Sequence, residues 1–279
     1  EFHYHQQRKG AILNIKSFLH PIVVKAKESV DDMHQKKYLK TNDHFLMKKL
    51  KDTAQSTRCF VIGNGPSLST TDLEVIQNEV TFASNRIYGL YERTSWRPTY
   101  YCSQDQKVLA QIKNDLSFAV SNCKQAFFPY NYKEIIGNNV CAMKNVHLFY
   151  KPYVSVYSED GTYPEGLMPF SKDVSRQVYD GLSITYAMIQ LAVYMGFKEI
   201  YLLGVDHNYP LKNGVVDTSQ SYAEGIKPID MSTQYPPELL LCEVSYREAR
   251  RFCEDRKISI KNATRGGKLE VFERISLEE

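Results

Sequence analysis

Residues able to bind a ligand stand directly after the first buried run of this sequence. The run begins at Cys59 and ends in Gly63, Asn64, Gly65, Pro66 and Ser67. Glycines allow a ligand to approach the backbone closely, and a helix N-terminus behind them favours phosphate. Asn64 can donate or accept a hydrogen bond, and Ser67 can cap a helix or reach a ligand. The segment predicts a nucleotide-binding turn, with a ligand-free strand-to-helix turn as the alternative. A Gly65→Val substitution is then expected to abolish binding and to keep the fold.

Polar residues also follow the other predicted strands or precede a later helix. They are Ser84, Asn85, Arg86, Ser103, Gln104, Asp105, Asp180, Gly181, Ser183, Asp206, His207, Asn208 and Tyr209. In open α/β sheets, ligands bind beyond the carboxyl ends of the strands. We therefore expect these residues to converge on one small-molecule site. Asp180 and Ser183 are equally compatible with simple helix caps.

Buried runs and helical spacing indicate the elements that would hold these residues. Strands are predicted at 59–63, 80–84, 98–102, 125–129, 146–150, 199–205 and 258–261, and helices at 67–77, 182–195 and 243–255. Strands that alternate with helices form a mostly parallel sheet with helices on both faces. The predicted fold is a Rossmann-like α/β domain over residues 56–279, preceded by a helical N-terminal arm over residues 1–55. The polar stretch at 209–237 is long enough to be a lid over the site.

The arm differs from the rest of the chain in charge. Of the formal net charge of +3, the first 51 residues contribute +6, from eleven Lys and Arg against five Asp and Glu. A basic arm with helical apolar spacing predicts peripheral contact with an anionic membrane. The alternative is a solvated helix that packs on the domain or on another subunit. Aromatic residues are not interleaved with the basic ones, so nucleic acid is not an expected partner.

Composition fits one cytoplasmic enzyme domain. The chain has 279 residues, of which 43% are hydrophobic, and no run approaches the ~20 apolar residues of a membrane span. The start lacks the features of a signal peptide. The six cysteines form no CxxC pair and have no spacing suited to zinc. We expect free thiols in a cytoplasmic protein, placed at the inner face of the membrane if the arm binds lipid.

Two carboxylates and one histidine are the candidate catalytic groups. His207 is the one histidine at a predicted strand end of the crevice, and unperturbed histidine titrates near working pH. We expect His207 to act as general base, Asp206 to orient or replace it, and Asp105 to be the next candidate. Asp105 and Asp206 would also bind Mg²⁺ if the reaction used it, or else accept hydrogen bonds from sugar hydroxyls. No metal ligand is predicted otherwise.

Several motifs together resemble known families. GNGPSL, a strand ending at Asn85, Gly181-x-Ser183 before a helix, YMGFKEIYLLGVDHNY and NATRGGKLEVF are similar to bacterial sialyltransferases that use a CMP-sugar, and more closely to MptE-like proteins. The resemblance implies that Asn64 and Asn85 contact a nucleotide, that Gly181 and Ser183 match the Ser-Gly of those enzymes, and that Tyr209 and Tyr222 hold the leaving phosphate. Those sialyltransferases use a histidine in the lid, whereas this chain has no histidine after His207.

The resemblance implies a glycosyltransferase of bacterial surface glycan synthesis. The donor would be a nucleotide-activated sugar, CMP-linked, and the acceptor a glycan or a lipid-linked sugar. Such a reaction needs no cofactor. One alternative is an MptE-like diphosphokinase that transfers pyrophosphate from ATP with Mg²⁺, and another is a nucleotide-binding module without catalysis. The sequence leaves an oligomer open.

Overall fold

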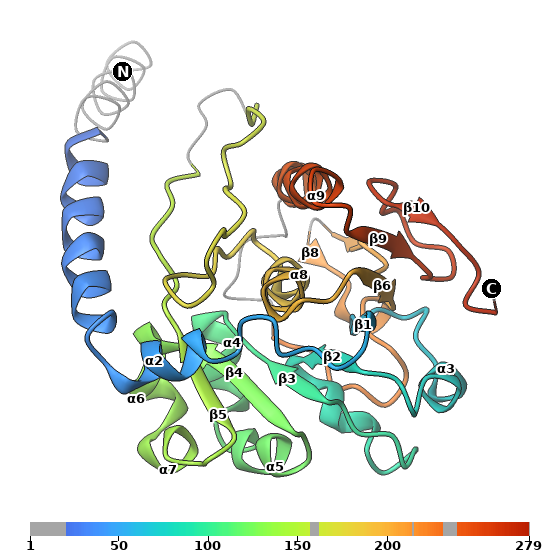
Figure 1. Cartoon of the computed structure of the whole chain (residues 1–279). Helices are drawn as coiled ribbons and strands as arrows, with labels where there is room; N and C mark the ends of the chain where they lie inside the picture. Colours follow the sequence, from blue (N-terminus) through green and yellow to red (C-terminus); the bar gives the residue numbers. More distant parts are fainter. Residues whose placement is uncertain (1–20, 157–161, 214, 231–238, 279) are drawn as a thin grey trace, which may run out of the picture.

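A computed structural model describes residues 21–156, 162–213, 215–230 and 239–278. Its centre is an eight-stranded sheet in the order β10-β9-β6-β1-β2-β3-β4-β5 (Figure 1). All seven strand pairings of this sheet are parallel. The strands are β1 Arg58–Ile62, β2 Thr81–Ser84, β3 Tyr100–Cys102, β4 Gln125–Pro129, β5 Val146–Phe149, β6 Glu199–Leu203, β9 Ser259–Asn262 and β10 Glu273–Arg274. The predicted Rossmann-like class is confirmed.

The strand order reverses at β1, which fixes the place of the site. The chain runs from β1 outward to β5 and then returns, so that β6 pairs with the other edge of β1, from Arg58 opposite Glu199 to Ile62 opposite Leu203. Loops that leave two neighbouring strands in opposite directions open a crevice between them, and this is where open α/β sheets bind ligands.

Helices cover both faces of the sheet, as expected. One face carries α2 Asn42–Lys48, α8 Ile184–Met195 and α9 Leu239–Glu254. The other carries α3 Thr70–Val75, the 3-10 helix η1 Asn85–Leu90, α4 Gln106–Ile112, α5 Leu116–Ser121, α6 Lys133–Ile136 and α7 Asn138–Cys141. The short 3-10 helices η2 Tyr130–Tyr132 and η3 Thr218–Gln220 complete the helical elements. Because both faces of the sheet are covered, successive side chains of a strand are buried on opposite faces. In β1, Val61 packs on the first face and Phe60 on the second.

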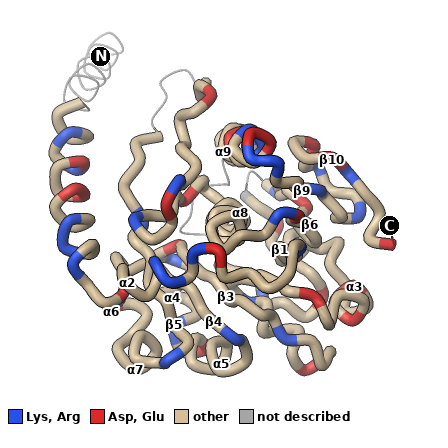
Figure 2. Tube along the Cα trace, viewed as in Figure 1, with Lys and Arg blue, Asp and Glu red and all other residues tan. Residues whose placement is uncertain are grey.

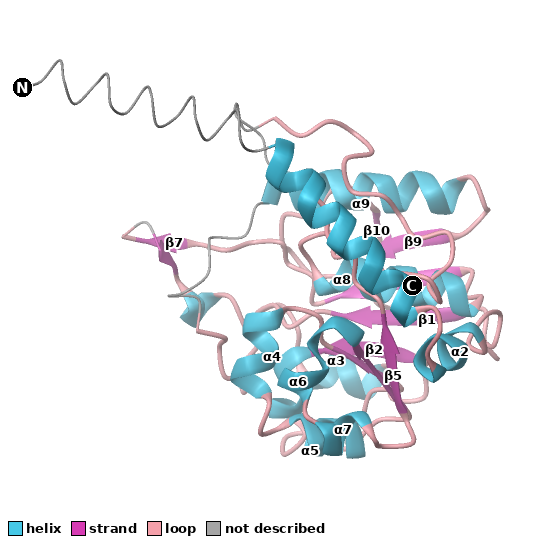
Figure 3. Ribbon diagram, turned by 90° about the vertical axis from the view of Figure 1, so that its left-hand side faces the viewer, coloured by secondary structure: helices cyan, strands magenta, loops and turns pink. Residues whose placement is uncertain are grey.

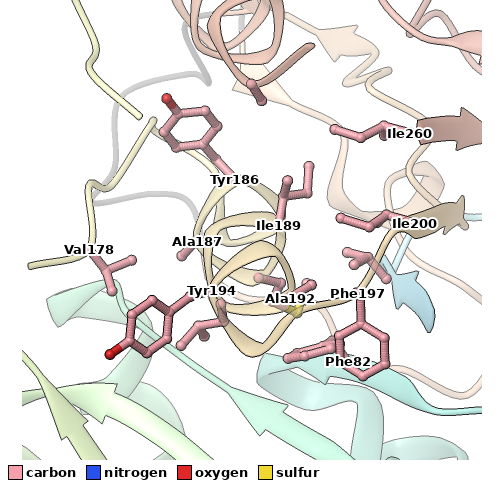
Figure 4. Close-up of a cluster of buried hydrophobic side chains, with 14 of the residues drawn as sticks. Phe82, Val178, Tyr186, Ala187, Ile189, Ala192, Tyr194, Phe197, Ile200 and Ile260 are labelled. Atoms are coloured by element: carbon pink, nitrogen blue, oxygen red, sulfur yellow. The ribbon is translucent and has the colours of Figure 1, made fainter. Parts of the chain in front are cut away.

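Helix α8 lies at the centre of the first hydrophobic core (Figure 4). Ten of its twelve residues are buried, and the figure shows Ile189 and Ala192 facing the strand residue Ile200. The helix ends at Gly196 in the left-handed conformation, with φ of 104°, which glycine adopts without steric cost. A helix that is apolar on nearly every side is buried on nearly every side.

The N-terminal part of the described chain is helical, as predicted. Residues 21–38 form one helix, here named the arm helix, which stands along the β5 edge of the molecule (Figure 1). Further along, Met47 and Leu50 belong to the first hydrophobic core. The predicted arm therefore includes residues that complete the core of the main domain.

The predicted lid begins with a small hairpin. Strands β7 Leu211–Lys212 and β8 Val215–Val216 pair in antiparallel fashion, and Figure 3 shows β7 projecting away from the main sheet. The predicted lid residues 231–237 lie outside the described residues.

Candidate functional site

The turn after β1 is held by the loop after β6. Gly63 N donates to Leu203 O at 2.8 Å, and Gly65 N donates to Gly204 O at 2.9 Å. A Cβ at Gly63 would lie 2.2 Å from Gly204 O, and one at Gly65 would lie 2.0 Å from Asp206 Oδ2. These two glycines are therefore required by contact between the two loops. The expectation that Gly65→Val keeps the fold is wrong, because the new side chain would meet the protein itself.

Asp206 joins the same two loops. Its carboxylate accepts from Ser67 Oγ at 2.7 Å and from Ser67 N at 3.3 Å. Burial raises the pKa of Asp206, and the hydrogen bonds from Ser67 oppose that shift. Ser67 does not cap α3, since Ser69 does so in a capping box with Asp72. The helix predicted from residue 67 therefore begins three residues later, at Thr70.

Four buried polar atoms at the carboxyl ends of the strands have no hydrogen-bond partner. The described part of the chain has eight such side-chain atoms, and four of them are Asn64 Oδ1, Ser84 Oγ, Gln104 Oε1 and His207 Nε2. These residues follow β1, end β2, follow β3 and follow β6. Buried polar groups normally have partners because an unmade hydrogen bond is costly. Their concentration at one end of the sheet marks the candidate site.

Asn64 and Asn85 are both fixed by neighbouring strands. Asn64 Nδ2 donates to Ser84 O at 3.1 Å, which leaves its carbonyl oxygen as the unpartnered atom. Asn85 has a positive φ of 53°. Its carbonyl oxygen accepts from Tyr101 at 2.6 Å, and its Oδ1 accepts from Ser103 Oγ at 2.9 Å. The structure thus joins the predicted residues Asn85 and Ser103, and it joins Asn64 to the end of β2.

Arg86 binds the predicted lid. Its guanidinium donates to the carbonyl oxygens of Pro228 and Lys227. The lid backbone also reaches the first turn, where Ala223 N donates to Asn64 O at 2.9 Å. Gln111 on α4 makes a third attachment by exchanging two hydrogen bonds with the backbone of Asp230, at 3.0 and 2.8 Å. The described lid residues are therefore attached to the site, and Arg86 is committed to holding them.

Both predicted tyrosines are protonated phenols in this environment. Burial raises the pKa of Tyr209, and Cys242, Tyr222 and Asp206 raise it further. Burial also raises the pKa of Tyr222, which the neighbouring Arg86 partly offsets. A phenol that keeps its proton can donate a hydrogen bond to an anion.

His207 faces α9. It has a positive φ of 51° and is 9% exposed. Its Nε2 lies 3.5 Å from Glu243 Oε1, which is within reach of an ion pair but long for a hydrogen bond. Burial lowers the pKa of His207, opposed by Glu243 and by the carbonyl of Leu239. Asp206, expected as its orienting group, is bonded to Ser67 instead. Glu243 is the carboxylate beside His207, and no local motif in the sequence connects the two residues.

Ser183 approaches His207 through a third residue. Ser183 Oγ lies 2.8 Å from Tyr246 OH, and the rings of Tyr246 and His207 are 5.9 Å apart. Ser183 does not bond the helix it precedes. Gly181 has φ of 58°, and a Cβ there would lie 2.2 Å from the ring of Tyr186. Packing against Tyr186 therefore requires glycine at position 181.

A partly buried lysine was not foreseen. Lys151, two residues beyond β5, forms an ion pair with Asp180. Burial lowers the pKa of Lys151, but Asp180 together with Tyr132 and Asp105 raises it by more, so the net shift is upward. Asp180 also accepts from Leu182 N at 2.7 Å and thereby shapes the turn before α8. The sequence feature that could have indicated this residue is its position directly after the predicted strand at 146–150.

Asp105 caps a helix. Its Oδ1 accepts from Val108 N at 2.9 Å at the start of α4. The two carboxylates suggested as Mg²⁺ ligands, Asp105 and Asp206, are thus each engaged by protein groups. Within the described ranges, no three His, Cys, Asp or Glu side chains are arranged to hold a metal. None of the six cysteines, all within described segments, forms a disulfide.

Two solved structures are similar to this chain at low sequence identity, and the first of them shares its fold. The MAf glycosyltransferase from Magnetospirillum magneticum AMB-1 matches 85% of this chain with a TM-score of 0.52 and 15% identity, and this chain spans 38% of that protein. The sialyltransferase CstII from Campylobacter jejuni, in complex with the substrate analogue CMP-3FNeuAc, matches 79% of this chain and 86% of its own, with a TM-score of 0.43 and 16% identity. No curated protein matches the chain.

The family comparison agrees with the topology and with the motifs around the switch point. The family described as 6-hydroxymethylpterin diphosphokinase MptE-like matches residues 33–212. This range includes the turn after β1, the strand ends of β2 and β3, the turn before α8 and the loop after β6. The chain belongs to the MptE-like family.

Proposed function

We propose that this chain is a glycosyltransferase that takes a nucleotide-activated sugar, with CMP as the leaving group. The observation that carries the proposal is a set of uncharged, buried atoms without partners among the described residues, at the carboxyl ends of β1, β2 and β3: Asn64 Oδ1, Ser84 Oγ and Gln104 Oε1. Neutral polar atoms suit the ribose and base of a nucleotide. The choice of cytidine follows the resemblance of GNGPSL to CMP-sugar enzymes, and the fold shared with a glycosyltransferase is compatible with it.

The proposed reaction uses the phenols and His207. An acceptor hydroxyl oxygen attacks the sugar carbon that carries the phosphate, the bond between that carbon and the phosphate oxygen breaks, and CMP leaves with the bonding electrons. His207 takes the proton of the hydroxyl, and Glu243 stabilises the resulting imidazolium. Tyr209 and Tyr222 donate hydrogen bonds to the phosphate as its negative charge grows.

The diphosphokinase remains the second candidate because the family's description names that activity. It would transfer pyrophosphate from ATP to a hydroxyl group. Its usual Mg²⁺ would be held by Asp105 or Asp206, whose carboxylates also accept hydrogen bonds from Val108 and Ser67. Calorimetric titration with CMP, UDP, GDP and ATP, each with and without Mg²⁺, separates the two functions. Binding of CMP without metal supports the transferase, whereas ATP bound only with Mg²⁺ would support the kinase.

Ser84→Ala locates the nucleotide. Among the described residues Ser84 Oγ has no hydrogen-bond partner, so its removal should not lower the free energy of unfolding. The loss of one hydrogen bond to the ligand should weaken CMP binding by about 1 kcal/mol, or roughly fivefold in Kd. Tyr91→Phe is the matched control, because it removes a buried unpartnered hydroxyl that follows η1. Equal Kd values for Ser84→Ala and the parent would place the nucleotide elsewhere.

A further inference from the structure

The arm helix has one face against the protein and another in solvent. Tyr38 is fully buried, and its hydroxyl donates to Leu148 O at 3.2 Å. Asp31 accepts from the Tyr150 hydroxyl at 2.6 Å, and Gln35 bonds Gln177. These residues recur every three or four positions, so they form a single stripe along the helix. They hold the helix to the β5 side of the domain.

Apolar side chains line the outer side of the same helix. Ile22 is 57% exposed, Val23 48%, Val30 49% and Met33 49%. With the exposed Ala26, these residues form the outer stripe. Spacings of three and four residues place them on one side. A helix in contact with water on that side would ordinarily carry polar residues there. The outer stripe is therefore an apolar surface that a partner with apolar groups could cover.

The charges of the arm helix are sorted around the outer stripe. Each of its lysines lies three or four positions from a stripe residue: Lys25 from Ile22, Lys27 from Val23 and Val30, and Lys36 and Lys37 from Met33. The acidic residues Glu28, Asp31 and Asp32 have no stripe residue at those spacings. Figure 2 shows both signs along this helix. The apolar surface is thus bordered by positive charge, while the acids border the docked side.

We propose that the outer stripe of the arm helix binds an anionic lipid surface, with the helix lying in the plane of the membrane. Apolar side chains enter the region between headgroups and acyl chains, and the bordering lysines contact lipid phosphates. A second copy of the chain is a poorer partner, because two arms that each carry +6 over 51 residues repel one another. The proposal stands on the arm alone and does not depend on the nucleotide site.

Vesicle flotation with the full chain tests the proposal. With phosphatidylcholine vesicles containing one third phosphatidylglycerol, the protein should float at low salt and be released at 0.5 M NaCl, where charges are screened within a few ångströms. It should not float with phosphatidylcholine alone. Val30→Asp with Met33→Asp should weaken binding at least tenfold. The control Val75→Asp changes an exposed valine of α3, 65% exposed, and should bind like the parent.

Two double variants of equal net charge test the contribution of the bordering lysines to membrane binding. Lys36→Glu with Lys37→Glu should lose binding, whereas Lys113→Glu with Lys144→Glu has the same net charge and changes exposed lysines on the body of the domain, so it should retain binding. All substituted side chains are exposed or half-exposed, and circular dichroism checks that each variant is folded.

Equal flotation of the stripe variant and the parent would overturn the proposal, as would equal binding of neutral vesicles. A concentration-dependent dimer in light scattering, abolished by the stripe variant and unaffected by lipid, would instead assign the stripe to a second copy. Loss of binding through the lysine pair alone would assign the surface to an acidic partner without an apolar component. Nucleotide binding should be the same in all these variants.

Discussion

The carboxylate of Asp206 holds Ser67 on one side and limits the space beside Gly65 on the other. Gly63 is limited differently, since the nearest atom to an added Cβ is the backbone oxygen of Gly204. A side chain added at Gly65 would meet the side chain of Asp206, which a mutation can remove. One added at Gly63 would meet backbone, which a mutation cannot remove. This difference makes the contact between the loops of β1 and β6 measurable.

Gly65→Ala should destabilise the fold by about 1–3 kcal/mol, as overpacking does. Asp206→Ala in the same chain removes the atom 2.0 Å from the new Cβ, leaving Gly204 O at 2.8 Å, and should restore part of the loss. The same change should not rescue Gly63→Ala, whose obstacle is backbone. Urea denaturation of the single and double variants gives the coupling energies. Equal rescue at both glycines would contradict the described packing.

His207 should set the acidic limb of the pH profile. A general base acts deprotonated, and burial lowers the pKa of His207 below its usual 6.5 despite Glu243. The value of kcat/KM should therefore rise with pH and level off before neutrality. Glu243→Gln removes a charge that raises this pKa, so the rise should move to lower pH. His207→Ala should lose 10²–10⁴-fold in kcat, and retention of more than about a tenth would remove His207 from the mechanism.

The lowered pKa of His207 also makes the stability of the fold depend on pH. The folded chain prefers neutral His207, so the unfolded chain binds more protons below pH 6.5. Stability attributable to this residue is present above the unfolded pKa and declines as pH falls through the folded one. His147, also buried with a lowered pKa, contributes in the same direction. It stacks on Phe127 within the sheet, so changing it should affect stability without moving the kinetic pKa.

Among the elements, α8 depends on one buried polar side chain. Gln190 is fully buried, accepts from Ser171 N at 3.1 Å and Tyr179 N at 3.0 Å, and donates to Tyr179 O at 2.8 Å. The segment before α8 has few backbone partners of its own in the described chain, and Gln190 provides three. It fixes that segment, and with it the turn that presents Ser183.

Gln190→Leu should destabilise the protein by about 3 kcal/mol. The two side chains are similar in size, so the cost arises from backbone groups left buried without partners, at about 1–3 kcal/mol each. Gln77→Leu, at an exposed position after α3, should change the free energy of unfolding by less than ~0.5 kcal/mol. Thermal and urea unfolding measure both. An unchanged free energy of unfolding in Gln190→Leu would mean that the backbone of the segment before α8 finds other hydrogen-bond partners.

The elements show where sequence patterns succeed. Apolar runs predicted every strand of the main sheet except the two-residue β10. The run from Cys59 to Ile62, which ends at Gly63, is one example. The turn residues also predicted which strand ends carry polar groups. Contacts between distant segments have no such pattern: the pairing of Glu243 with His207, and that of Lys151 with Asp180, arises only when the sheet and helices come together.

Across the whole molecule, the lid and the body are linked by backbone contacts. Arg86 holds two carbonyl groups of the lid, and Gln111 holds the backbone N–H and carbonyl group of Asp230. Arg86→Ala should release residues 217–230, increase their cleavage by chymotrypsin after Tyr222, and raise KM more than it lowers kcat. Arg97 also binds carbonyl oxygens, but those of Tyr91, Thr94 and Trp96. Arg97→Ala should therefore leave the lid protected, and equal cleavage in both variants would contradict the lid assignment.

Of the described residues, none lies in a helix long and apolar enough to cross a membrane.

The placement of β6 beside β1 has a consequence for synthesis on the ribosome. Roughly 140 residues separate the paired positions Arg58 and Glu199, which at about 5–20 residues per second takes some 7–28 s. During this time β1 can pair with β2, but its other edge has no native neighbour. An unpaired apolar strand edge is a template for aggregation. A nascent chain stalled before residue 199 should accordingly bind chaperones through β1, and release them once β6 emerges and closes the sheet.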